Sequence, residues 1–440
     1  MATRTLQSSG VQFDDQRNFY LSPRVTQELW PSVMPFTTVI SQGNVRSPGE
    51  MEDTIFKLFE HRNPWRRQYF DNNGDSVTIN TNDADSSEIT IDGITGLNST
   101  VDASYIGLEC EVWDSTETTL RGSVLVTSVP SSTGIKVRNL DGATSISTVD
   151  NDRFVVVGNA HGEGASSPEA WADDLHMAWN STQEFRTPYE ISRKLRKAAL
   201  KGEMKELDRL KKQKAGEHKM QKEKAFLFGR NPVGTNLDPS SADTFTDASG
   251  NGAAWRTDAN GNVVRTTMGI FTAIDKYGNS SGEDQNIFSF AASAFTWKNY
   301  VAITEKMFQY LPNSGFKRAF CGRGAMSIWA VWGTDGIGGN SGWQVQLSPY
   351  KKDRLGFNFR TLETPHGVLQ LIPTPAIDRG RNDWMLVIDH DDLLHAMYER
   401  PEFRQNIKVD NAPSLQKDEY WSDEGLGITL IEKHSVIKFT

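Results

Sequence analysis

The side chains best suited to hold a metal ion lie near the carboxyl end of the chain, where Asp389, His390, Asp391 and Asp392 precede His395. Carboxylates and imidazoles are common ligands of zinc and iron. Their spacing is poor, because two residues five apart do not share a helical face. Asp391 or Asp392 would also serve as the N-cap of a helix over the Leu-Leu-His-Ala-Met-Tyr-Glu segment that follows. We therefore interpret this segment as a strand end and a helix cap, and predict no metal site.

Other polar strings also resemble functional motifs without completing them. Residues 71–75, 247–252 and 258–262 resemble calcium loops, but none has the full loop with its closing glutamate. Each contains an Asn-Gly or Ser-Gly dipeptide, which is typical of turns. Gly338–Gly342 places a serine between glycines but lacks the strand–nucleophile–helix context of a hydrolase. No phosphate-binding or dinucleotide-binding loop is present, so we predict no catalytic residue and no cofactor.

The composition of the 440 residues limits the class of protein further. A length of this order predicts about three domains. Cys110 and Cys321 are the only cysteines and lie 211 positions apart, which excludes a disulfide scaffold and a cysteine zinc site. No run of 18 apolar residues and no secretory signal are present, so we expect no membrane span. These features favour a reducing cytoplasm, or an assembly made there.

The charge is distributed unevenly along the chain. The net charge is −9, and residues 72–159 account for all of it with thirteen acidic and four basic residues. Residues 188–228 instead hold thirteen lysines and arginines and six acidic residues. An acidic block and a basic block in one chain indicate a protein with two electrically different faces.

The acidic block has the texture of a small β domain. Short β-branched segments are separated by turns rich in Gly, Asn, Asp and Ser, which is typical of a sandwich or barrel. Six strands are predicted, at residues 76–81, 87–93, 108–114, 123–129, 134–140 and 152–158. Because the block begins and ends inside other structure, we interpret it as an inserted all-β domain.

The basic block predicts one long helix. Pro188 suits a helix start and Gly229 a helix end. Ile191, Leu195 and Ala199 form one apolar stripe, and about forty residues would make a rod of roughly 60 Å. The remaining segments mix strands and helices, so the fold class is α+β. A helix is expected over residues 295–310, a hairpin over 355–373 and strands at the carboxyl end.

The first fifty residues predict an extended arm that packs against another surface. Neither a helical nor a strand period persists there. The segment nevertheless contains aromatic side chains that would be unusual in a disordered tail. Those expected to contact a neighbour are Phe13, Phe19, Tyr20, Trp30 and Phe36.

This order of elements resembles the major capsid proteins of tailed phages with the HK97-like fold, and most closely the family typified by the SU-ten phage major head protein. The resemblance covers about residues 10–440. The segments that carry it are Val157–Ala160 with Glu163-Gly164, Asn180–Arg186, Glu217–Gly229, Arg265–Ile270 and Glu432–Ile437.

The resemblance implies the roles of each part of the chain. It implies a virion shell subunit, assembled in the host cytoplasm, that forms hexamers and pentamers of an icosahedral capsid around double-stranded DNA. Portal, scaffolding and decoration proteins are the further partners it implies, with no membrane. The implied parts are an N-terminal arm (1–50), an extended-loop region (51–71 and 160–185), the inserted β domain (72–159), a spine helix of the peripheral domain (186–229), an axial domain (230–350) and the remaining axial and peripheral strands and helix (351–440).

The basic helix is the candidate surface for packaged DNA. Its lysines would meet phosphates without sequence selectivity, and no aromatic residues interleave them to stack on bases. A solvated face or an inter-subunit face is the alternative. The residues concerned are Lys211, Lys212, Lys214, Lys219, Lys222 and Lys224.

Three other functions remain open at this point. An encapsulin-type shell shares the implied fold but encloses enzymes, and the long insert argues mildly against it. A metal-dependent hydrolase would use the Asp389–His395 segment. A host-recognition protein would bind carbohydrate through residues 72–159, a role the module could also have when displayed on a capsid.

Overall fold

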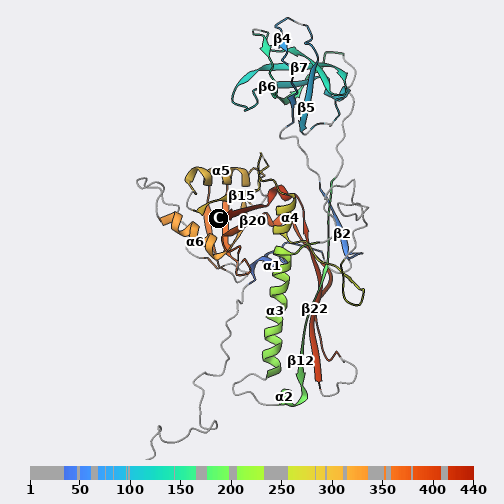
Figure 1. Ribbon diagram of the computed structural model, residues 1–440, viewed down its shortest axis with the longest axis vertical. Coiled ribbons are helices and arrows are strands. Elements are labelled where there is room, and N and C mark those ends of the chain that lie inside the picture. The colour runs from blue at the N-terminus through green and yellow to red at the C-terminus, as the bar shows by residue number, and fades with distance from the viewer. Residues whose placement is uncertain are drawn as a thin grey trace, which may run out of the picture. The chain divides into compact units, whose positions relative to one another are not determined.

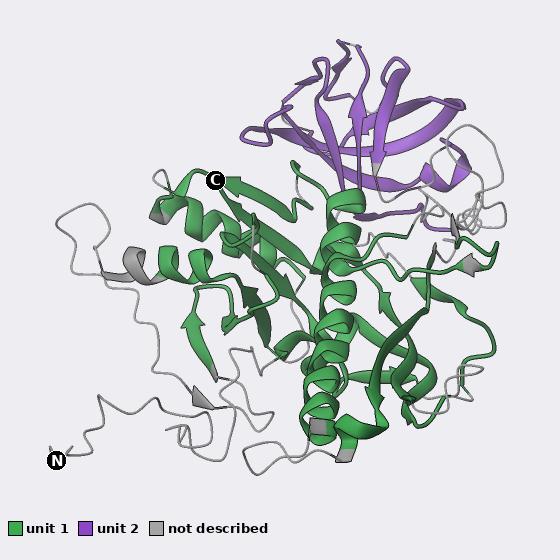
Figure 2. Ribbon diagram, turned by 60° about the horizontal axis from the view of Figure 1, so that its bottom comes forward, with its two compact units in different colours: residues 1–60, 177–440 green, residues 61–176 purple. Residues whose placement is uncertain are grey.

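The computed structural model divides into two compact units, one formed by residues 61–176 and the other by residues 1–60 with 177–440 (Figure 2). The residues that it describes are 34–46, 50–60, 68–74, 76–82, 84–95, 97, 100–142, 144–164, 176–197, 206–231, 256–282, 284–292, 295–310, 315–334, 351–352, 358–377, 380–407 and 415–440.

The smaller unit contains a closed antiparallel barrel with strand order β10-β3-β5-β8-β7-β6. Its strands are β3 (Tyr69–Asn72), β5 (Ile89–Thr95), β6 (Leu108–Trp113), β7 (Leu120–Ser131), β8 (Gly134–Asn139) and β10 (Arg153–Asn159). A separate pair joins β4 (Thr78–Ile79) to β9 (Ile146–Ser147), and the 3₁₀ turn η2 spans Ala103–Tyr105.

Alternating side chains fill the barrel interior. Cys110 and Val112 of β6 point inward, where Phe70 stacks on Phe154 with ring centroids 5.2 Å apart. All six segments predicted as strands contain strands, so the inserted all-β domain is confirmed as a barrel. The sixth barrel strand is β3, in a segment that the sequence indicated as loop, because its few residues complete the barrel only through partners distant in the chain.

The larger unit is built on two sheets (Figure 1). The first has the order β1-β21-β22-β12, and α3 lies against β12 and β22. The strands of this sheet are β1 (Asn44–Arg46), β12 (Gln183–Ser192), β21 (Leu393–Arg404) and β22 (Leu415–Ile428). The helices of the same region are α1 (Pro35–Ile40), α2 (Arg193–Lys197) and α3 (Glu206–Phe228).

The prediction that the long helix begins at Pro188 is wrong. Residues 183–192 form β12, which pairs antiparallel with β22 over ten residues. Their side chains alternate between buried and exposed, with Phe185, Tyr189 and Ile191 facing inward. Leu195 is 47% exposed, so the apolar stripe expected of a helix does not form. The helix α3 does end at Phe228, just before Gly229 as predicted, and its 23 residues span about 35 Å.

The second sheet has seven strands in the order β15-β23-β20-β16-β19-β18-β17. They are β15 (Ile287–Phe290), β16 (Phe316–Cys321), β17 (Lys351–Lys352), β18 (Asn358–Glu363), β19 (Val368–Pro373), β20 (Trp384–Ile388) and β23 (Ser435–Phe439). The helices of this region are α4 (Ile270–Tyr277), α5 (Trp297–Met307) and α6 (Arg323–Thr334). The predicted helix near 295–310 and the hairpin within 355–373 are confirmed.

Two hydrophobic cores lie on opposite faces of this sheet. In β20, Leu386 and Ile388 belong to the core that includes α1, α3 and α4, whereas Met385 and Val387 belong to the core that includes α5 and α6. This alternation is the period of two expected of a strand covered on both faces. Smaller pairs join β2 (Ile55–Glu60) to β11 (His176–Ser181) and β13 (Arg256–Thr257) to β14 (Val263–Val264), and a 3₁₀ turn, η7, spans Ile431–Lys433.

Candidate assembly and nucleic-acid surfaces

Three of the six lysines predicted to face DNA are exposed on α3. These are Lys212, Lys219 and Lys224. The positively charged end of Lys211 lies over the Phe403 ring, 5.1 Å from its centroid, and Lys214 pairs with Glu217 at 2.6 Å.

For Lys222 the prediction is wrong. This side chain is buried and faces β22, where its Nζ lies 2.9 Å from Glu424 Oε1. Whether a lysine on a helix is buried or exposed depends on which elements pack against that helix, and the local sequence does not identify those elements.

Glu424 is the centre of a buried charged cluster between α3 and the first sheet. It accepts from Lys222 on one oxygen and lies 2.8 Å from His395 Nε2 on the other. Burial raises the pKa of this carboxyl, but the His395 hydrogen bond and the Lys222 charge outweigh burial and hold the pKa at about 2. The other ring nitrogen of His395 lies 3.4 Å from Ser41 Oγ, so the cluster also reaches the turn after α1.

His218 lies on the same face of α3 and is held by two hydroxyls. Its Nε2 is 3.0 Å from Ser422 Oγ and its Nδ1 is 3.1 Å from Thr187 Oγ1. Burial and then the charge of Lys222 lower the pKa of His218 to about 4. The ring is therefore neutral near pH 7, and it links α3 to both β22 and β12.

The start of α1 is anchored to α3 by Glu223. This fully buried carboxylate accepts from the Phe36 and Thr37 backbone nitrogens at 3.3 and 2.9 Å and from Thr37 Oγ1 at 2.7 Å. It thus caps the amino end of a helix from another element, where a negative charge is favourable. Burial raises the pKa of Glu223.

Phe36 packs into the core of its own chain, contrary to the prediction that it contacts a neighbouring subunit. The side chain is fully buried, with its ring centroid 5.2 Å from that of Phe320. The other arm aromatics lie outside the residues that the structure describes. They are Phe13, Phe19, Tyr20 and Trp30.

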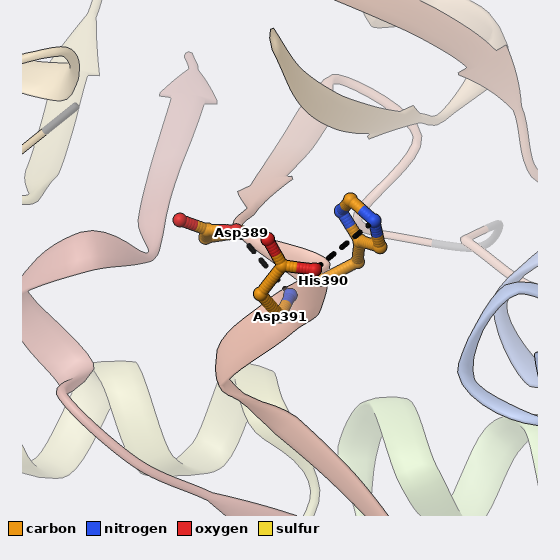
Figure 3. A group of neighbouring side chains, drawn as sticks. All are labelled: Asp389, His390 and Asp391. Carbon is orange, nitrogen blue, oxygen red and sulfur yellow. Dashed lines mark hydrogen bonds and ion pairs between the residues drawn. The ribbon is translucent and has the colours of Figure 1, made fainter. Parts of the chain in front are cut away.

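The segment that resembled a metal site forms a self-capped turn, and His395 is not part of it. The ligand atoms of Asp389, His390 and Asp391 lie within 4.8 Å of one another. Asp389 Oδ1 accepts from the Asp391 backbone nitrogen, which caps the turn (Figure 3). The predicted helix after this turn is wrong, because β21 pairs with β22 and places His395 on Glu424.

The acidic surplus of the barrel remains at its surface. Three of its four basic residues pair with acids of the same unit, namely Arg121 with Asp152, Arg138 with Asp85 and Arg153 with Asp71. Other acids of this unit are exposed. They are Glu88, Asp92, Asp141 and Asp150.

Sequence reasoning missed the buried network around Glu424. Its partner Lys222 is 202 residues away in the chain and its partner His395 is on another strand, β21, and these polar side chains carry no local signal of burial. The alternation within residues 183–192 could have revealed the strand and, with it, the inward direction of Thr187.

None of the helices in the described part of the chain is long and apolar enough to cross a bilayer. No curated protein matches the chain. Among solved structures, the capsid of Myoviridae phage XM1 is 9% identical, with 98% of this chain and 100% of that chain covered and a TM-score of 0.44. The capsid of the native GTA particle is 9% identical, with 97% of each chain covered and a TM-score of 0.43. The SrpI encapsulin of Synechococcus elongatus PCC 7942 is 7% identical, with 61% and 76% covered and a TM-score of 0.38.

The family is decided by a match of the sequence itself. Residues 29–415 match the model of the SU10 major capsid protein family, which is most of the chain. This match favours the capsid over the hydrolase and host-recognition hypotheses, and over the encapsulin. The protein therefore belongs to the SU10 major capsid protein family and is a phage major capsid protein with the HK97-like fold that its sequence resemblance implies.

Proposed function

We propose that the chain forms hexamers and pentamers of an icosahedral shell, assembled in the host cytoplasm, that encloses double-stranded DNA. The N-terminal arm contacts a neighbouring subunit through Phe13, Phe19, Tyr20 and Trp30. Scaffolding, portal and decoration proteins are its further partners. The acidic barrel faces the exterior, where like charges on separate particles oppose clumping. Family membership supports the shell, and the charge distribution supports the assignment of its faces.

The observation that carries the DNA-facing role is the exposure of one row of lysines on α3. Lys212 and Lys219 are seven residues apart, so they lie two turns apart on one side of the helix. Their ammonium groups offer charge without a fixed hydrogen-bonding pattern, which suits binding to phosphates of any sequence. On the buried face of the same helix, Lys222 contacts Glu424 and His218 contacts Ser422.

Reversal of these two charges tests the proposal. In the variant with Lys212→Glu and Lys219→Glu, we expect shells to form while the affinity of the unassembled chain for a DNA duplex falls. Loss of two phosphate contacts would lower the slope of log affinity against log salt by about 1.8. The measurements are negative-stain electron microscopy of the particles and fluorescence anisotropy of a labelled duplex at several salt concentrations.

A matched control carries the same change in net charge elsewhere. Lys298 on α5 and Arg400 on β21 are exposed, and the variant with both changed to glutamate should keep the salt slope of the wild type. An equal loss in the two variants would attribute the effect to net charge and contradict the role of α3. Failure of the wild-type chain to form rings or shells with its scaffolding partner would contradict the proposed assembly.

A further inference from the structure

Three aromatic side chains from α3, α4 and β20 meet where α3 ends. Figure 1 labels these three elements. Phe228 of α3 stacks on Phe271 of α4 with ring centroids 5.1 Å apart. Trp384 of β20 continues the cluster, with its ring 5.9 Å from that of Phe271. Phe271 is buried, whereas Phe228 and Trp384 are half-buried and reach the surface.

Two cations lie against this aromatic cluster. The Arg381 guanidinium lies 4.5 Å from the ring centroid of Phe228 and 5.4 Å from that of Trp384. Lys438 Nζ lies 4.8 Å from the Trp384 ring. The exposed Lys224 is four residues before Phe228 and so shares its side of α3.

Two other arginines that lie over aromatic rings, Arg153 and Arg404, have acidic partners. Arg153 lies 4.2 Å from the Tyr69 ring centroid and pairs with Asp71 and Glu117. Arg404 lies 3.9 Å from the Trp421 ring centroid and pairs with Glu402. Within the described ranges, no carboxylate pairs with Arg381. A guanidinium that contacts two rings keeps its N–H donors, which can bind an anion in the bidentate mode.

We propose that this aromatic–cation cluster (Phe228, Phe271, Trp384, Arg381 and Lys438) is a second nucleic-acid contact, in which the edge of Arg381 binds a backbone phosphate. The inference rests on the proposed enclosure of DNA and names a specific group for it.

The position of the cluster beside the exposed lysines of α3 favours a phosphate over an acidic face of another subunit as the ligand. Lys438 is held by Asp275 at 2.8 Å, and that carboxylate is 67% exposed. Arg381, against the Phe228 ring, and Lys224, one helical turn before Phe228, remain as positive charges. Because Lys224 also adjoins the lysines of α3, the cluster extends the basic surface already assigned to DNA.

Substitution of Arg381 tests the contact in the full-length chain. We expect Arg381→Gln to lower the affinity of unassembled protein for a labelled 30-base-pair duplex by about tenfold, as for the loss of a charge-assisted hydrogen bond. The salt slope should fall by about 0.9, as for one phosphate. Arg381→Lys should keep the slope while losing part of the affinity, because an ammonium cannot bind in the bidentate mode.

The control removes an arginine of the same type whose charge is already neutralised. Arg404→Gln should leave both affinity and slope unchanged, and thermal unfolding of each variant checks its fold. A folded Arg381→Gln protein with the affinity and slope of the wild type overturns the inference, even if the α3 double variant loses binding as proposed. A folded Arg381→Gln protein that binds DNA normally but forms no shells also overturns it and assigns the cluster to a subunit interface. No salt-dependent binding by the wild type would contradict the DNA-facing function itself.

Discussion

Glu424 is a residue whose importance comes from burial and from two partners. The carboxylate is inaccessible to solvent and is shared between Lys222 and His395. Desolvation of a charge is costly, so removal of one member of such a group leaves the others uncompensated. Glu424 is therefore one of the side chains on which the stability of the contact between α3 and the first sheet depends most.

We expect Glu424→Gln to reduce the free energy of unfolding by about 3 kcal/mol. The pKa of Glu424 is lowered to about 2 in the folded protein, from the ordinary glutamate value of 4.5. The stabilisation is therefore present above pH 4.5 and is lost as the pH falls toward 2. Urea denaturation of both proteins between pH 7 and pH 3 measures the difference, which should narrow at the acid end.

The control for this substitution is Glu402→Gln. Glu402 pairs with Arg404, but its side chain is 51% exposed, and exposed pairs contribute little to stability. A loss in the Glu402 variant equal to that in the Glu424 variant would show that burial is not the cause.

The sequence predicted which element a residue belongs to better than it predicted whether the side chain is buried or exposed. The six lysines predicted to face DNA all lie on α3, yet Lys222 faces inward. The aromatic Phe36 was expected at a neighbour and is in its own core. Both outcomes depend on a partner strand or helix far along the chain, and no local pattern identifies that partner.

At the scale of elements, the joint between α3 and α4 depends on a close backbone approach. A Cβ atom added to Gly269 would lie 2.6–2.7 Å from backbone atoms of Leu227, Phe228 and Gly229. Such distances are shorter than van der Waals contact, and backbone atoms cannot rotate away as side chains do. Only glycine allows α4 to begin this close to the end of α3.

We expect Gly269→Ala to lower the free energy of unfolding by about 2 kcal/mol, because the two helices must move apart. It should also weaken the stack of Phe228 on Phe271. Chemical denaturation followed by tryptophan fluorescence gives the measurement. Gly43→Ala is the comparison, since its added Cβ would meet its nearest atom at an ordinary 3.6 Å. Equal stability of the two variants would refute the close-approach argument.

Elements were predictable where one local period decided them. The barrel strands other than β3, together with α5 and the β18–β19 hairpin, follow from alternation or from a helical stripe. Residues 183–192 fit both a helical and a strand period, and pairing with β22 makes this segment a strand. The segment after Asp392 contains good helix formers, yet pairing with β22 makes it β21. Tertiary pairing overrides local preference in both cases.

At the scale of the whole molecule, the barrel unit has what an independent domain needs. It has its own hydrophobic core and a closed sheet without free edges among the barrel strands. Residues 61–176 also form a compact unit by themselves. Chains of roughly this length bury enough surface to fold alone.

We expect residues 61–176 expressed alone to fold and to unfold in one cooperative transition. Circular dichroism should show β structure, and thermal melting should be reversible. Phe154→Ala in the same fragment should lower stability by about 3 kcal/mol, because this ring is fully buried against Phe70. A fragment without a cooperative transition would show that the barrel needs the rest of the chain.

The pairing of β2 with β11 has a consequence for the evolution of this chain. Thr182, just after β11, donates its backbone N–H to the carbonyl of Thr54, just before β2, so the two strands run antiparallel. Their opposite ends, near Glu60 and His176, are therefore neighbours, and the chain leaves and returns to the larger unit at nearly one point. A domain whose termini lie close together can enter such a point without disturbing either sheet. The β2–β11 pair is thus a site where one small domain can replace another during evolution while the rest of the shell subunit stays the same.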